Sequence, residues 1–317
     1  MSNAKEIITV GLVGNSIPGL IAQCIEAAGI NNRWHIVDID RELVQVSRSK
    51  PLSLVRKSFE LLRGILNVRK VDIVIVVFVS PFASIYKTAA HFFGKKIVYY
   101  WLGSDVAAAL ASRNAEKRFK GADLNLSYSE GNIAELASIG IDAHLLVTPT
   151  RLSEGIAKMP ERHAVLLSIP DSRKEFYGYN DLMRLVDLFP QVNFYVVRSG
   201  HPEYYDRPNI IFKGMLDREQ MSELFNEVSI SVRWPEHDGT SLILIESALK
   251  GKYIISRNPF PCGVVTSSFE DLCRVLTDLI NEPPRPCEEN REYALSHFTQ
   301  DRAGLILAGY LENLIMR

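Results

Sequence analysis

Residues 230–256 read ISVRWPEHDGTSLILIESALKGKYIIS, and this stretch indicates how the chain folds. A short β-branched run, 230–232, precedes a polar loop, 233–240. An apolar stretch of helical length follows over 241–250, and a second β-rich run occupies 253–256. Strand, helix and strand in this order predict two parallel strands joined by a crossover helix.

The same alternation extends over most of the chain. Up to residue 147, β-rich runs alternate with stretches of helical spacing, and the run Val71–Val79 is rich in β-branched residues. Such a run is typical of a parallel strand covered on both faces. Pro and Gly interrupt the periodicity over 148–162, which we interpret as an interdomain linker, and the alternation resumes at Ala164. We therefore expect two doubly wound parallel sheets, an α/β architecture.

Helices are expected in three further places. Leu43–Val68 is a long, basic, helix-like region, and a second helix is expected after Asp105 as far as Lys120. The closing stretch Gln300–Met316 also has helical spacing. Three prolines shortly before it, at 283, 284 and 286, predict a rigid break in the chain.

Composition excludes several classes of protein. The 317 residues carry a formal net charge of −1, so a general affinity for nucleic acid is not expected. The longest strongly apolar run, Val71–Phe82, is interrupted by Asp72 and Pro81 and is too short to span a membrane. No secretory signal is visible, and the cysteines lack metal-site spacing, which favours a reduced, cytoplasmic location. The four cysteines are Cys24, Cys262, Cys273 and Cys287.

The polar loop and the helix after it form a candidate site for an anionic ligand. Free N–H groups and the positive end of the helix dipole favour a diphosphate there, and Gly239 allows close approach to the backbone. Asp238 precedes the helix, and Glu246 lies about two turns into it. Asp238 is either a ligand or a helix cap, and Glu246 either binds a polar group such as a ribose or pairs with a nearby Lys or Arg. The residue types alone leave these alternatives open.

This stretch resembles the signature of the retaining glycosyltransferases of family 4, which have the GT-B fold. That signature is an acid, Gly, two residues, Leu, three residues, Glu, Ala or Ser, and a Gly four positions on. Its residues in this chain are Asp238, Gly239, Leu242, Glu246, Ser247 and Gly251. Asp238 stands in place of the usual Glu, and Thr240-Ser241 in place of the usual Phe-Gly. The stretch Leu102–Val106 is similar to the family's His-Gly-Ser-Asp-Val loop, with Leu102 in the place of the His.

The resemblance covers most of the chain and implies its organisation. Two Rossmann-like domains would face each other across a cleft. Residues 1–150 would form the N-terminal, acceptor-side domain, and residues 160–298 the C-terminal domain that binds the nucleotide-sugar. The C-terminal helix, 299–317, would pack back on the first domain.

The resemblance also implies an activity, the transfer of a hexose from a nucleoside-diphosphate sugar with retention. The acceptor would be a glycan, a lipid or a small metabolite, and neither metal nor cofactor is expected. Glu246 would hold the ribose, Asp238 would bind a sugar hydroxyl, and Arg173 or Lys174 would steady the leaving diphosphate. Further donor-side residues are His237, Arg198, Gly239, Thr240, Ser241 and Leu242. Acceptor-side residues are Gly14, Asn15, Ser16 and Asp105.

Three departures from the family pattern motivate an alternative. Leu102 replaces a His that reaches the donor sugar in relatives, and Tyr177 replaces a Lys that precedes Gly178. Arg198 stands where a Gly usually follows the next strand. A non-catalytic binding or partner subunit with the GT-B fold is the alternative function.

Two other motifs are weaker indications of function. The loop Gly14–Gly19 lacks the middle Gly of the dinucleotide fingerprint, which makes a nicotinamide-dependent oxidoreductase the least favoured alternative. Asp38-Ile39-Asp40 spells a paired-acid motif that holds a metal in other glycosyltransferases. Two alternating acids at a strand end are common by chance, so no metal site is predicted.

Residues 46–70 are rich in Lys and Arg, with apolar side chains near helical spacing. This pattern is either a solvated helix with a buried stripe or a peripheral contact with an anionic membrane or a lipid phosphate. The basic residues are Arg48, Lys50, Arg56, Lys57, Arg63, Arg69 and Lys70.

Overall fold

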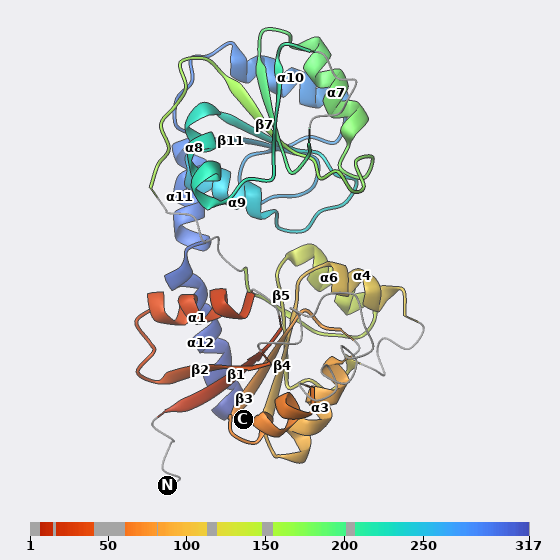
Figure 1. Cartoon of the computed structure of the whole chain (residues 1–317), viewed down its shortest axis with the longest axis vertical. Helices are drawn as coiled ribbons and strands as arrows, with labels where there is room; N and C mark the ends of the chain where they lie inside the picture. Colours follow the sequence, from red (N-terminus) through yellow and green to blue (C-terminus); the bar gives the residue numbers. More distant parts are fainter. Residues whose placement is uncertain are drawn as a thin grey trace. The chain divides into compact units, whose positions relative to one another are not determined.

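The computed structural model describes residues 7–14, 17–40, 61–80, 82–112, 119–147, 155–200 and 207–316. The chain divides into two compact units, one of Met1–Pro149 with Gln300–Arg317 and one of Thr150–Thr299. Each unit holds a six-stranded sheet whose paired strands are all parallel (Figure 1). The two predicted doubly wound sheets are therefore confirmed.

The first unit is built from alternating strands and helices. Its strands are β1 (Ile8–Val13), β2 (Trp34–Asp40), β3 (Ile73–Val77), β4 (Lys96–Trp101), β5 (Leu124–Ser127) and β6 (His144–Leu145). Its helices are α1 (Ile17–Ala27), α3 (Ala83–Phe92), α4 (Ser104–Leu110), α6 (Glu130–Ser138) and α12 (Gln300–Met316), and residues 61–68 are also helical. The strand order is β2-β1-β3-β4-β5-β6, so the winding direction reverses between β1 and β3.

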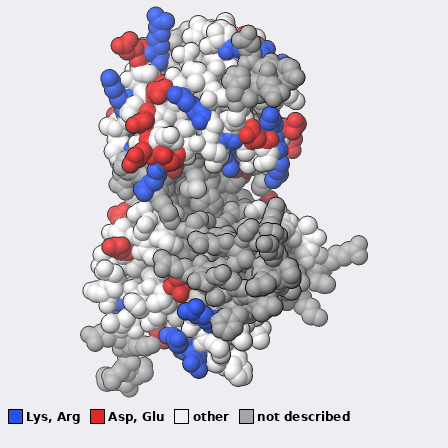
Figure 2. Space-filling model, in the orientation of Figure 1, with Lys and Arg blue, Asp and Glu red and all other residues white. Residues whose placement is uncertain are grey.

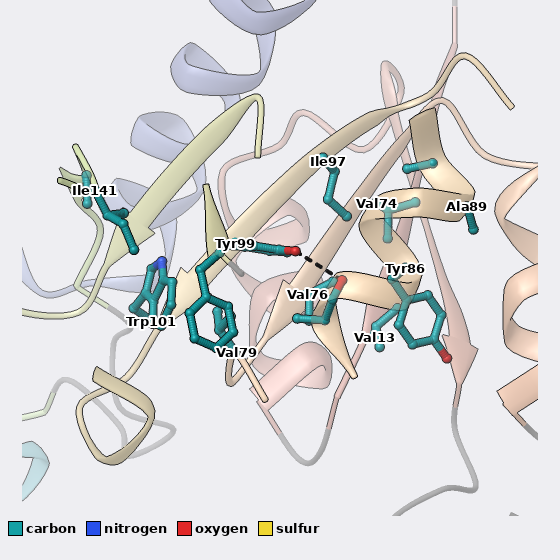
Figure 3. Packing of buried hydrophobic residues seen from close by; sticks show 14 of the residues in the cluster. Val13, Val74, Val76, Val79, Tyr86, Ala89, Ile97, Tyr99, Trp101 and Ile141 are labelled. Carbon is teal, nitrogen blue, oxygen red and sulfur yellow. Dashed lines mark hydrogen bonds between the residues drawn. The ribbon is translucent and has the colours of Figure 1, made fainter. Parts of the chain in front are cut away.

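Helices cover both faces of this sheet, which explains its apolar central strands. Val74 and Val76 of β3 pack on the face covered by α3, α4 and α6, whereas Ile75 packs on the opposite face under α1 and α12. Figure 3 shows the first of these faces, where the hydroxyl of Tyr99 donates a 3.0 Å hydrogen bond to the carbonyl of Ala83. Successive residues of β3 are buried because their side chains alternate between two covered faces.

Helix α12 packs against α1 in the first unit, as Figure 1 shows for the blue and red helices. The contact is so close that a methyl group added to Gly304 would overlap the carbonyl of Cys24. Leu307 and Leu311 continue the same face of α12 into the sheet's core. The position of Gly304 therefore sets how near the two helices lie.

The second unit repeats this plan. Its strands are β7 (Ala164–Ser168), β8 (Asn193–Val197), β9 (Ile210–Gly214), β10 (Ile230–Arg233), β11 (Tyr253–Ser256) and β12 (Val264–Val265). Its helices are α7 (Tyr179–Leu188), α8 (Arg218–Glu227), α9 (Leu242–Leu249), α10 (Phe269–Ile280) and α11 (Glu288–His297). α7 and α10 cover one face of the sheet, and α8 and α9 cover the other (Figure 1). Figure 2 shows Lys and Arg interspersed with Asp and Glu over the visible surface of this unit.

Some elements differ from their predictions. α4 ends at Leu110 rather than at Lys120, and residues 113–118 lie outside the described part. The helix expected over 43–68 is described only over 61–68. α11 was not predicted, and it begins directly after the proline-rich break.

Candidate functional site

The second sheet has the strand order β12-β11-β10-β7-β8-β9, so its winding direction reverses between β7 and β10. In open α/β sheets, ligands bind beyond the carboxyl ends of the strands at such a reversal. Two loops lie at this point, residues 169–178 after β7 and residues 234–241 after β10. Most of the predicted donor-side residues lie on these two loops.

The two loops are fastened to each other. The N–H of Glu236 donates a 2.8 Å hydrogen bond to the carbonyl of Phe176. Gly178 has a φ of 73°, and a methyl group added there would overlap the carbonyl of Trp234. The indole N–H of Trp234 donates to a carboxylate oxygen of Asp181 at 3.1 Å, on the first turn of α7. A glycine at 178 is thus required both by its backbone conformation and by the close approach of the second loop.

The N-terminus of α9 lies at the end of the second loop. Ser241 is the N-cap residue; its carbonyl accepts hydrogen bonds from Leu244 and Ile245, and its hydroxyl makes no capping bond. Gly239 and Thr240 before it are half-buried, and Leu242 is exposed. The first N–H groups of a helix have no intrahelical partner, so this end can receive an anion.

Asp238 is paired with a residue that sequence reasoning missed. Nε of Arg233 donates to Oδ2 of Asp238 at 2.6 Å. Nη1 of Arg233 donates to the carbonyl of Ser168, at the end of β7, at 3.1 Å. The guanidinium also lies over the ring of Tyr177, 4.8 Å from its centroid. An Arg that ends a β-branched run, where an apolar residue is expected, was the only signal in the sequence.

Glu246 lies on α9 and is half-buried. Its charge acts on Lys250, one turn further on. Burial lowers the pKa of Lys250 and the charge of Arg291 lowers it further, whereas Glu246 raises it. The ammonium of Lys250 donates to the carbonyl of Gly155 at 3.0 Å. Glu246 thus interacts electrostatically with the C-cap residue of α9, and its role as a ribose ligand stays a prediction.

The predicted cations follow β7 and β8. Arg173 is exposed, has a φ of 65° and stacks on Phe176, with Cζ 4.2 Å from the ring centroid. Nζ of Lys174 lies 5.5 Å from the centroid of the Tyr179 ring. Arg198 is exposed as well, and its φ is 69°. Left-handed backbone at non-glycine residues costs about 1–3 kcal/mol and is most common at functional sites.

Asp171 joins the loop after β7 to the loop after β8. Its Oδ1 accepts a hydrogen bond from the hydroxyl of Ser199 at 2.6 Å, and the N–H of Gly200 donates to both carboxylate oxygens. The Ser199 hydrogen bond is the main reason that the pKa of Asp171 lies below its usual value. This contact holds the Arg198 loop beside the Arg173 loop. His237, on the loop after β10, is exposed.

The predicted acceptor-side residues belong to the first unit. Gly14 follows β1, at the reversal of the first sheet, with a φ of 139°. A methyl group added there would lie 2.7 Å from the carbonyl oxygen of Val77. Asn15 and Ser16 lie outside the described residues. Leu102 is half-buried against the core.

Asp105 is 2% exposed, and backbone groups surround its carboxylate. Oδ2 accepts from the N–H of Val79 at 2.8 Å. Oδ1 accepts from Leu102, Gly103 and Val106, at 2.9, 2.8 and 3.1 Å. Asp105 therefore ties the loop after β3 to the loop after β4, which is a positioning role.

Among the residues that the structure describes, no helix is long and apolar enough to cross a membrane. No group of three or more His, Cys, Asp or Glu side chains in the same part of the chain is arranged to hold a metal ion.

Comparison with known proteins identifies the fold. No protein-family model matches the chain, and no curated protein matches it. Sucrose-phosphate synthase from Thermosynechococcus elongatus matches with a TM-score of 0.68 and 14% identity, covering 98% of this chain and 99% of that one. The lipopolysaccharide outer core galactosyltransferase WaaB, in its apo form, matches with 0.67 and 14%, over 98% and 99%. UDP-GlcNAc 2-epimerase from Neisseria meningitidis, bound to UDP-GlcNAc, matches with 0.57 and 13%, over 96% and 100%. The predicted GT-B fold is confirmed.

Proposed function

We propose that this chain is a retaining glycosyltransferase that moves a sugar from a nucleoside-diphosphate sugar to a glycan, a lipid or a small metabolite. One observation carries the proposal: the glycosyltransferase-like signature forms the loop and helix beside the winding reversal of the second sheet. Asp238 lies just before the N-terminus of α9, and Glu246 lies within the helix. Loop and helix thus present acids and free N–H groups at the place where such a sheet binds its ligand.

The proposed roles follow from the chemistry of each group. The backbone of Gly239–Leu242, with Arg173, Lys174 and Arg198, stabilises the negative charge on the leaving diphosphate, which is the main source of catalysis. Glu246 accepts hydrogen bonds from the ribose, and Asp238 accepts one from the sugar. The leaving phosphate takes the acceptor's proton as the new bond forms on the same face of the sugar, so the anomeric configuration is retained.

The fold alone does not select this reaction, because transferases and an epimerase both match the chain. What favours transfer is the signature and its place in the sheet. The solved epimerase is bound to UDP-GlcNAc, and a uridine nucleotide is a natural first probe for this chain. Leu102, Tyr177 and Arg198 are the departures from the family pattern that motivate the alternative function, a non-catalytic binding or partner subunit.

A thermal-shift panel tests the proposal. UDP, GDP, ADP, their sugars and NAD are each added to the intact chain, and ligand at a hundred times its Kd should stabilise the protein by about 2.7 kcal/mol. A shift with one nucleoside diphosphate and its sugar supports transfer. The products then decide the rest: retained anomeric configuration by NMR, and full activity in EDTA, support the retaining, metal-independent mechanism.

Other outcomes of the panel point elsewhere. No shift with any nucleotide would contradict the transferase proposal and favour the partner-subunit alternative. A shift with NAD alone would contradict both and favour an oxidoreductase. Binding of a sugar nucleotide whose sugar is only epimerised would overturn transfer while keeping the site.

Peripheral membrane contact is a separate part of the proposal. Of the basic residues predicted over 46–70, Arg63, Arg69 and Lys70 lie in the described part and are exposed, and the others lie outside it. Beside them, Leu62 and Leu66 are exposed, as is Phe92 on α3. Basic and apolar side chains together favour an anionic bilayer. Co-sedimentation with anionic but not neutral vesicles, lost on changing Arg63, Arg69 and Lys70 to Gln, is the expected result; equal sedimentation of both would refute it. A cytoplasmic location stays a prediction.

A further inference from the structure

Arg233 connects three segments that meet at the winding reversal of the second sheet. Its guanidinium contacts Asp238 from the loop before α9, the carbonyl of Ser168 at the end of β7, and the ring of Tyr177 from the loop before α7. Arg233 itself is the last residue of β10 and is 7% exposed. A buried guanidinium held from three sides has little freedom to move, so whatever it binds is held in one place.

The geometry of the pair determines which part of Asp238 is available. Nε of Arg233 engages Oδ2, and the other oxygen, Oδ1, makes no hydrogen bond with any other residue in the described part. The Asp238 side chain is 21% exposed, against 8% for Arg233. Oδ2 of Asp238 is therefore held by Arg233, and Oδ1 can accept a hydrogen bond from a ligand. Such a charged acceptor binds a hydroxyl more strongly than a neutral group does.

We propose that Arg233 is a positioning residue for sugar recognition, which holds Asp238 so that its second oxygen accepts a hydrogen bond from a hydroxyl of the donor sugar. This inference rests on the proposed function and adds to it the residue that orients the sugar-binding acid. We assign Arg233 to holding Asp238 rather than to touching the sugar, because Arg233 is 7% exposed and its Nε and Nη1 already donate to Asp238 and Ser168.

The pairing also bears on the length of the acid at 238. Nε of Arg233 and Oδ2 of Asp238 lie 2.6 Å apart, slightly closer than is usual for a charge-assisted hydrogen bond. A Glu would carry its carboxylate one methylene group further from the backbone, so we expect Asp238→Glu to change the orientation in which Arg233 holds the carboxylate.

The test compares two ligands on the same variants. Isothermal titration measures the Kd of the nucleoside diphosphate that binds the intact chain, among UDP, GDP and ADP, and the Kd of its sugar nucleotide. In Arg233→Gln, Asp238→Asn and Asp238→Glu, affinity for the sugar nucleotide should fall about tenfold or more, as expected for losing a hydrogen bond to a charged group. Affinity for the bare diphosphate should change less than about threefold, because the sugar contact is absent there. The double variant Arg233→Gln with Asp238→Asn should be no worse than the worse single variant, since the residues act as one unit.

Two further variants keep the result interpretable. Arg233→Lys retains the charge without the planar fork, so it should retain folding and lose part of the sugar preference. Arg274→Gln is the matched control: Arg274 lies on the surface of α10, 3.3 Å from Asp271, and its loss should leave both affinities unchanged. If Arg233→Gln does not fold, Arg233→Lys and the two Asp238 variants decide the question.

Three outcomes would overturn the inference. Equal loss of affinity for the diphosphate and its sugar in folded variants would show that the pair only maintains the loops. Unchanged affinity for both would show that the pair has no part in binding. If no diphosphate binds the unaltered chain, the proposed function fails and this inference fails with it, whereas the first two outcomes leave the proposed function standing.

Discussion

Replacing Lys252 with methionine is expected to change how the stability of the second unit depends on pH. Lys252 has no exposed surface, and its ammonium donates to the carbonyl of Lys158 at 3.0 Å and lies 3.6 Å from the sulfur of Met159. No carboxylate is among these hydrogen-bond partners. Burial, and secondly the charge of Lys250, lower the pKa of Lys252 from 10.5 to about 8.

The direction in which stability changes with pH follows from the protons that the folded and unfolded chains bind. Between pH 8 and 10.5 the unfolded chain keeps the Lys252 proton and the folded chain releases it, so this residue makes folding more favourable as pH rises. At about 1.4 kcal/mol per unit of pKa, the whole change is about 3 kcal/mol. This stabilisation is fully present above pH 10.5, and it is lost as the pH falls to 8.

Urea-induced unfolding of the intact chain, followed by circular dichroism, measures this effect. Just below pH 8 and again near pH 10.5, the free energy of unfolding is compared between the unaltered protein and Lys252→Met. The unaltered protein should gain about 3 kcal/mol relative to the variant over this range. Lys213→Met is the matched control, because it removes a half-buried lysine of the same unit whose ammonium, unlike that of Lys252, lies 3.6 Å from a carboxylate, that of Glu227. A constant difference between the unaltered protein and Lys252→Met would refute the reasoning.

Three further predictions concern other residues. Glu246→Ala should abolish sugar transfer without lowering the thermal midpoint by more than a few degrees; transfer at a normal rate in this folded variant would contradict its assignment to the ribose. Gly304→Ala should lower the free energy of unfolding by about 1–3 kcal/mol, because the new methyl group meets the carbonyl of Cys24. Gly309→Ala, on the same helix with open space around it, is the control and should be neutral or stabilising in the same urea experiment. Asp105→Asn should cost about 1–3 kcal/mol, since an amide cannot accept all four backbone N–H groups, and an unchanged thermal midpoint would exclude the positioning role.

The strands were predictable where local pattern and burial coincide. The run Val71–Val79 contains β3, Ile73–Val77, and all five residues of that strand are buried. Helices on both faces demand an uninterrupted apolar run, which a single sequence displays directly. Only the ends differ, because a strand ends where its pairing ends and not where β-branched residues run out.

α11 was not predictable on the same grounds. Only Asn290 and Ala294 of this helix are buried, so the sequence contains no apolar stripe at helical spacing. Its position is fixed by tertiary contacts instead. The side-chain amide of Asn290 donates to the carbonyl of Lys252 at 3.1 Å, and the helix packs against α9. A helix held by such contacts leaves little trace in its own residues.

The candidate site likewise contains residues that the sequence could reveal and one residue, Arg233, that it could not. The loop from Asp238 into α9 is one continuous stretch, so its acids, its glycine and the helix that follows could be recognised together. Arg233 could not be assigned a role, because that role depends on β10 lying directly beside β7, sixty-five residues earlier in the chain. Nothing in either strand indicates this pairing. It follows from the reversal of winding, which places the fourth strand of the unit next to the first. The residue that pairs with the acid is therefore visible only once the sheet is assembled, because the sheet brings the end of β10 beside the end of β7.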